Sequence, residues 1–197
     1  SSSSAASDVY KRQSYSRYFV SQVQTSKAQK NFSGLKTALR IFWSREAVYK
    51  LNRLIKDEKP EAAIVHSVYH QLSPSVLSVL KKHNIPTVMI LHDYKIITPL
   101  YNLYHPKLDD QATDVSPNGW EIIRHRYIKD SLAASTISVL EHQLHKLLKT
   151  YAKSVGTYIA PREFTRQVFL QRKRSDEFEG KMITVPNFLS LNGEVES

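Results

Sequence analysis

Polar side chains, histidines among them, follow two short apolar runs of this sequence. Residues 62–65 are followed by His66, Ser67, Tyr69, His70 and Gln71, and residues 87–91 are followed by His92, Asp93, Tyr94 and Lys95. A histidine beside an aspartate can act as a base, an acid or a hydrogen-bond donor near neutral pH. His92 and Asp93 are therefore the leading candidates for a functional site. The alternative is a buried histidine paired with a carboxylate for structural reasons. For the polar residues that follow position 65, the only evidence for a functional role is their position directly after a predicted strand.

The runs themselves predict strands of a parallel sheet. Residues 87–91 are nearly all apolar and rich in β-branched side chains, which is typical of a strand buried on both faces. Between the two runs, Ser73 is expected to cap a helix that has Pro74 at its first position. Strand, helix and strand in this order form a right-handed βαβ unit. Ligands bind beyond the carboxyl ends of such strands, where the polar groups stand.

The rest of the chain extends the same pattern. Helical periodicity predicts helices over residues 35–57 with a break near Ser44, over 120–151 with one break, and from Glu163 onward. Further strands are predicted at residues 155–160 and 181–185. The predicted fold class is α/β, with a Rossmann-like parallel sheet flanked by helices.

Composition limits the classes of function. The chain has 197 residues and no cysteine, which excludes disulfides and thiolate metal sites. Its net charge of +10 favours polyanions, phosphate-rich substrates or anionic membranes as partners. No apolar run approaches the ~18 residues that span a bilayer, and no glycine-rich phosphate loop is present. His142 and His145 share a helix face without a third ligand, so we expect surface or packing histidines and no metal.

The motifs L-H-D-Y-K-I-I-T-P-L-Y and I-V-H-S-V-Y-H-Q-L-S-P-S-V-L resemble the amino-terminal domain of family 4 glycosyltransferases. The likeness covers residues 35–188. These are two-domain GT-B enzymes that build bacterial capsules, O-antigens and exopolysaccharides. The resemblance implies one half of a GT-B fold and transfer of a sugar, with retention, from a nucleotide-sugar donor to a saccharide or lipid-linked acceptor. It implies neither a cofactor nor a metal.

The resemblance also implies roles for individual residues. His92 would be catalytic, beside the transferred sugar, with Asp93 and Tyr94 on the acceptor side. The resemblance gives further candidates for substrate binding, which are His66, Tyr69, His70, Gln71 and Arg45. For Arg45 the roles are binding of an acceptor phosphate or a surface ion pair. The chain departs from the family at Thr98, where relatives often have Cys, and at Arg162, where they usually have Ser.

The chain is expected to consist of three parts, the first of which does not belong to the family resemblance. Residues 1–13 look like a translated sequencing adapter, residues 14–188 form the acceptor-side domain, and residues 189–197 lead toward a nucleotide-sugar-binding domain. Such a fragment alone is expected to be inactive. The implied location is the cytoplasm, with peripheral contact at the inner face of the membrane. Residues 35–43 are one candidate for that contact, and a helix packed on the sheet is the alternative for them.

Two other functions remain open. One is a non-catalytic α/β module that binds an anionic ligand or partner through the same strand ends. The other is a nucleic-acid-binding domain, which rests on charge alone; no nucleic-acid partner is expected, because the charges are spread over helices.

Overall fold

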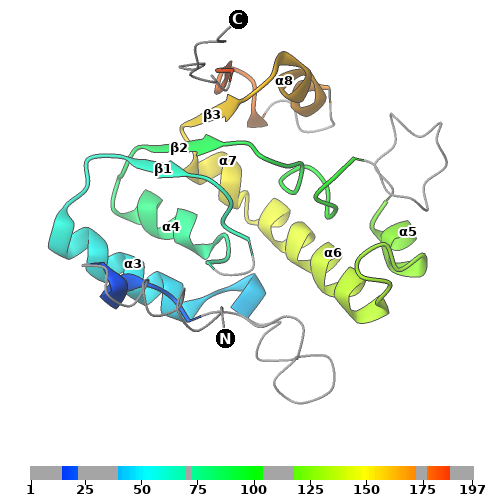
Figure 1. Cartoon of the computed structure of the whole chain (residues 1–197), viewed down its shortest axis with the longest axis horizontal. Helices are drawn as coiled ribbons and strands as arrows, with labels where there is room; N and C mark the ends of the chain where they lie inside the picture. The colour runs from blue at the N-terminus through cyan, green and yellow to red at the C-terminus, as the bar shows by residue number, and fades with distance from the viewer. Residues whose placement is uncertain (1–14, 22–39, 70–71, 104–117, 172–176, 187–197) are drawn as a thin grey trace, which may run out of the picture.

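The computed structural model describes residues 15–21, 40–69, 72–103, 118–171 and 177–186. The described chain contains four strands, which form one sheet in the order β1-β2-β3-β4. They are β1 (Ala63–Val65), β2 (Thr87–Ile90), β3 (Thr157–Ala160) and β4 (Met182–Thr184), and every neighbouring pair is parallel. The predicted α/β class with a Rossmann-like parallel sheet is confirmed (Figure 1).

Helices connect and precede these strands. They are the 3-10 helix η1 (Ser16–Tyr18) and the α-helices α3 (Arg45–Glu58), α4 (Ser75–Lys82), α5 (Gly119–Arg124), α6 (Leu132–Leu147), α7 (Thr150–Ser154) and α8 (Glu163–Leu170). Helix α4 joins β1 to β2, and α8 joins β3 to β4. Parallel crossovers are right-handed. Since the strands follow one another across the sheet in chain order, their connections pack on the same face.

The core lies on that face. The strand register aligns Val65, Met89, Tyr158 and Met182 in one row across the sheet. This row packs against side chains from three helices, Leu77 of α4, Tyr151 of α7 and Phe169 of α8. Tyr158 and Phe169 are fully buried.

The opposite face of the sheet is open among the described residues. Ile64 of β1 is 69% exposed and Ile183 of β4 is 49% exposed. In β2, buried residues alternate with the partly exposed Val88 and Ile90. The expectation that β2 is buried on both faces is therefore wrong for the described part of the chain. The strand order explains this result, since it places the crossover helices on one side only.

Helix boundaries follow local capping signals. The Ser44 side chain accepts a hydrogen bond from the Ala47 amide at 3.2 Å, which confirms the predicted break and the start of α3. Helix α3 ends at Glu58, and Lys59 takes the left-handed conformation (φ 48°) ahead of Pro60. Helix α4 begins at Ser75 with Pro74 as its N-cap residue and no capping bond from a side chain, so the expectation that Ser73 caps the helix and Pro74 is its first residue is wrong by one position. The region 120–151 is interrupted twice, not once.

Several expectations fall on residues that lie outside the described ranges. They concern residues 1–13 and 189–197, His70 and Gln71, and most of residues 35–43. Of that last segment, residues 40–42 are helical and Trp43 is 43% exposed. No described helix has both the length and the apolar character that crossing a membrane requires.

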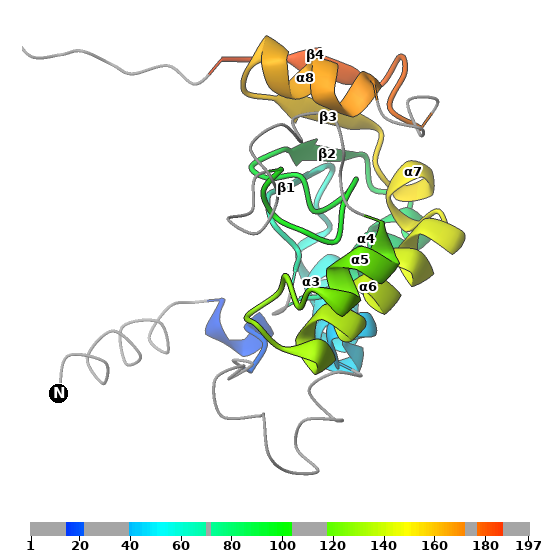
Figure 2. The same ribbon diagram turned by 90° about the vertical axis from the view of Figure 1, so that its right-hand side faces the viewer.

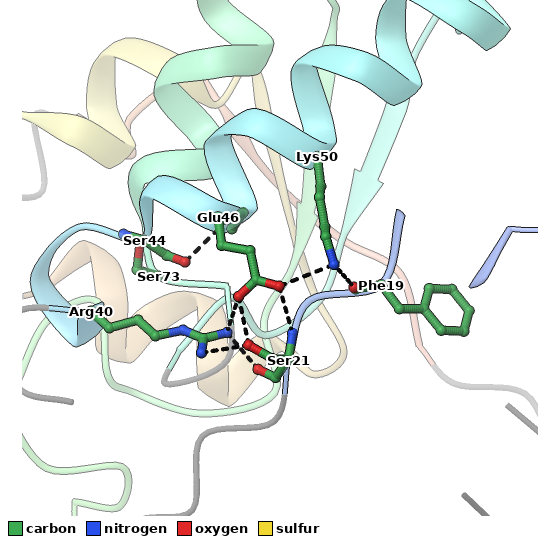
Figure 3. Close-up of polar contacts among 8 residues, drawn as sticks. Phe19, Ser21, Arg40, Ser44, Glu46, Lys50 and Ser73 are labelled. Carbon is green, nitrogen blue, oxygen red and sulfur yellow. Dashed lines mark hydrogen bonds and ion pairs between the residues drawn. The ribbon is translucent and has the colours of Figure 1, made fainter. Parts of the chain in front are cut away.

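A group of charged side chains ties the chain before α3 to the first turn of that helix (Figure 3). The Glu46 carboxylate accepts hydrogen bonds from the Ser21 amide at 2.9 Å and the Ser21 hydroxyl at 2.6 Å. It also pairs with Arg40 and Lys50, each at 3.0 Å, and Lys50 donates to the Phe19 carbonyl. Burial raises the pKa of Glu46, but the Ser21 and Lys50 contacts outweigh it and lower the pKa to about 2.

We expect Glu46→Gln to destabilise the chain by about 1–2 kcal/mol at neutral pH. Because the pKa of Glu46 falls from 4.5 to about 2 on folding, its contribution is complete above pH 4.5 and is lost as the pH falls toward 2. Urea denaturation at several pH values measures both effects. Glu58→Gln is the control, since Glu58 meets Arg17 at 3.6 Å with both side chains more exposed. Equal losses in the two variants would contradict the assigned role of Glu46.

Candidate functional site

The structure brings the two strand-end histidines into direct contact. His66 follows the last residue of β1, and His92 lies two residues beyond the end of β2. Nδ1 of His66 and Nε2 of His92 are 2.8 Å apart. The rings are stacked with centroids 5.1 Å apart and planes inclined by 14°. Both side chains are exposed, so His92 is not a buried structural histidine.

This contact restricts the protonation states of the pair. A hydrogen bond between two imidazole nitrogens needs one donor and one acceptor, so at least one ring is neutral. The contact occupies one nitrogen of each ring. In the described part of the chain, Nδ1 of His92 and Nε2 of His66 have no hydrogen-bond partner. The pair can therefore offer a donor and an acceptor to a ligand at the carboxyl edge of the sheet.

Asp93 is engaged by residues other than His92. Its Oδ1 accepts a hydrogen bond from the Lys95 amide at 2.9 Å. Burial raises the pKa of Tyr69, and the charge of Asp93 and a hydrogen bond to it raise this pKa further. Tyr69 thus remains a protonated hydrogen-bond donor. No hydrogen bond joins Asp93 to His92 among the described residues, so the adjacent pair in the sequence does not form a dyad in the fold.

Tyr94 faces the core. Its ring centroid lies 5.9 Å from that of Phe169, and the side chain packs against the main hydrophobic cluster. The Tyr94 amide donates to the Tyr101 carbonyl, and the Tyr94 carbonyl accepts from the amides of Ile97 and Thr98, all at 3.0 Å. Tyr94 therefore holds the loop that follows β2, and its ring is not placed beside the histidines.

A buried ion pair lies beneath this loop, which sequence reasoning did not find. Lys95 Nζ is 2.9 Å from Glu141 Oε2, and the two side chains are 4% and 5% exposed. Lys95 also donates to the Ser138 hydroxyl at 2.7 Å and lies 5.5 Å from the centre of the Tyr101 ring. Burial, followed by the charges of Glu141 and Asp93, raises the pKa of Tyr101. The pair anchors the loop after β2 on α6.

One sequence signal pointed toward this pair. Glu141 is the single acidic residue of α6, and it lies on the buried side of that helix with Ser135, Val139 and His145. A lone carboxylate at such a position needs a partner. The sequence alone did not show that this partner is Lys95.

Ser73 connects the amino-terminal ends of α3 and α4. Its hydroxyl accepts a hydrogen bond from the Ser44 amide at 3.0 Å and lies 2.6 Å from the Ser75 hydroxyl. Ser73 is fully buried and has a positive φ of 59°. This contact holds Arg45, the first residue of α3, in an exposed position. Neither an ion pair nor a contact with the histidines is found for Arg45 among the described residues.

The histidines of α6 do not extend the site. His145 is 2% exposed, and its Nδ1 lies 3.1 Å from the Thr150 hydroxyl. Burial lowers its pKa, which favours the neutral ring of a packing residue. Within the described residues, no group of three or more histidine or acidic side chains is arranged to hold a metal.

Comparison with known proteins adds no relative. No family model, no curated protein and no solved structure matches this chain. Functional inference therefore depends on the fold and on the chemistry of the strand-end residues.

Proposed function

We propose that this chain is the acceptor-side domain, one half of a GT-B fold, of a retaining family 4 glycosyltransferase. It would act in surface-polysaccharide synthesis, moving a sugar from a nucleotide donor to a saccharide or lipid-linked acceptor. The observation that carries the proposal is the contact between His66 and His92 at the carboxyl edge of a parallel sheet. Both histidines belong to the two motifs that resemble the family.

The exposed nitrogens give the site a chemical role. Sugars offer hydroxyl groups, each of which both donates and accepts hydrogen bonds. In the proposed complex, Nδ1 of His92 bonds a hydroxyl of the transferred sugar, and His66 holds the ring of His92 by its stacked contact. Tyr69 and Asp93 form the adjoining wall through their own hydrogen bond. Tyr94 supports this wall from the core side.

The proposal includes the partners and the location. The nucleotide-sugar donor is bound by a second domain, no metal takes part, and the enzyme works in the cytoplasm at the inner face of the membrane. The basic charge of the chain, +10, favours approach to anionic lipids and phosphate-bearing acceptors.

A transfer assay on the complete gene product tests this proposal. Radiolabelled nucleotide sugars are incubated with the protein and bacterial membrane lipids, with and without EDTA. We expect label to enter the lipid or saccharide fraction at the same rate in both conditions. Absence of transfer with every common donor sugar would refute the transferase proposal, and a requirement for a divalent cation would refute its metal-free form.

A second candidate is a non-catalytic module that binds an anionic ligand. The observation in its favour is that Asp93 bonds Lys95 and Tyr69, so that no carboxylate among the described residues orients His92. Two imidazoles and a basic surface would bind an anion without turnover. Binding of a nucleotide or phosphosugar that is lost in His92→Ala, with no transfer in the assay above, would favour this candidate.

A further inference from the structure

One solvent-facing arc of α6 carries no charged residue, and the exposed Lys146 lies outside this arc, in the last turn. With 3.6 residues per turn, six positions fall within an arc of about 100° on this side. They are Leu132, Ala133, Thr136, Leu140, Gln143 and Leu147, and we call them the α6 leucine stripe. Its leucines at positions 132, 140 and 147 are 53%, 53% and 80% exposed.

Core packing does not account for this stripe. The helix buries its other side through Val139, Glu141 and His145. The outer side of such a helix normally carries charged and polar residues. Here the one hydroxyl of the stripe, on Thr136, is bonded to the Leu132 carbonyl at 2.9 Å. In Figure 1, α6 runs from the lower right of the molecule, next to α5, inward to α7.

Basic residues stand at both ends of the stripe. Arg124 and Arg126 precede α6, and Lys146, Lys149 and Lys153 lie at or beyond its carboxyl end. All five are exposed, and none forms an ion pair within the described residues. The acid of α6, Glu141, is buried against Lys95 and does not offset them. Figure 2 shows α5, α6 and α7 together on one side of the molecule.

We propose that the α6 leucine stripe docks on the surface of an anionic phospholipid bilayer. Leucines enter the boundary between headgroups and acyl chains, while lysines and arginines meet lipid phosphates. A second copy of the chain fits less well. Whether two α6 helices paired parallel or antiparallel, basic ends would face basic ends. The proposal deepens the membrane contact of the proposed function by naming its surface, and it uses no residue of the histidine site, so the two are tested separately.

Flotation with lipid vesicles tests this surface on the whole chain. We expect the chain to float with phosphatidylcholine vesicles that contain about a third phosphatidylglycerol, and to float poorly with phosphatidylcholine alone. The double variant Leu140→Gln/Leu147→Gln should bind about tenfold more weakly. The matched control is Tyr49→Gln/Phe164→Gln, whose residues are 66% and 64% exposed on other helices. It should bind within about twofold of the unchanged chain.

A charge variant tests the contribution of the basic residues at the ends of the stripe to lipid binding. Lys146→Gln/Lys153→Gln should lower binding to the anionic vesicles by about tenfold, with a weaker dependence on salt. Circular dichroism checks that each variant is folded. Equal binding of the leucine variant and its control, or no flotation of the unchanged chain, would overturn the proposal. So would a dimer that the leucine variant converts to a monomer in light scattering, because the occupant would then be a second copy. None of these outcomes affects the sugar-transfer assay.

Discussion

Replacing Lys95 with methionine is expected to lower the free energy of unfolding by about 3–5 kcal/mol. The substitution keeps an unbranched side chain, one heavy atom shorter, and removes the charge. It leaves the Glu141 carboxylate, 5% exposed, without the ammonium that now lies 2.9 Å away. The Ser138 hydroxyl and the Pro99 carbonyl also lose their hydrogen bonds to Lys95. Urea denaturation followed by circular dichroism measures the change.

Two companion variants decide whether burial is the cause. The double variant Lys95→Met/Glu141→Leu removes both charges and should recover most of the loss, because apolar residues often replace a buried pair without net cost. The matched surface variant is Arg166→Met. Arg166 meets Glu163 at the same 2.9 Å, but the side chains are 38% and 51% exposed, so the loss should stay below about 1 kcal/mol. Equal losses for Lys95→Met and Arg166→Met would show that the buried pair is not an anchor.

His92→Ala is expected to lower kcat/KM for sugar transfer by about 10²–10⁴-fold in the complete enzyme. This expectation depends on the proposed function. Alanine removes the ring that His66 holds at 2.8 Å and with it the free Nδ1 that would meet the sugar. Since His92 is exposed, the substitution should leave the stability of the fold nearly unchanged. Initial rates at varied acceptor concentration give the constant, and thermal unfolding gives the stability.

His83→Ala serves as the control for the loss of a histidine. His83 lies at the carboxyl end of α4, at the opposite edge of the sheet, and its Nε2 contacts the Asn52 side chain at 2.7 Å. Its removal should leave transfer within about twofold of the unchanged enzyme. If His92→Ala were as active as His83→Ala, the strand-end histidines would not form the site.

The sequence by itself determined the four strands of the described chain and the start of α3. Residues 87–91 predicted β2 to within one residue, and Ser44 predicted the start of α3. These features depend on neighbours a few residues away, through apolar runs and a capping side chain. Local signals also placed His66 and His92 directly after strands, but their contact at 2.8 Å depends on the pairing of β1 with β2 and appears only in the tertiary structure.

The tertiary structure decided which groups are partners. Asp93 adjoins His92 in the sequence but bonds Lys95 and Tyr69 in the fold, and Lys95 finds Glu141 on a helix more than forty residues away. The open face of β2 and the outward leucines of α6 likewise depend on where other elements pack. An apolar pattern shows that a side chain is suited to burial, whereas the path of the whole chain decides what covers it.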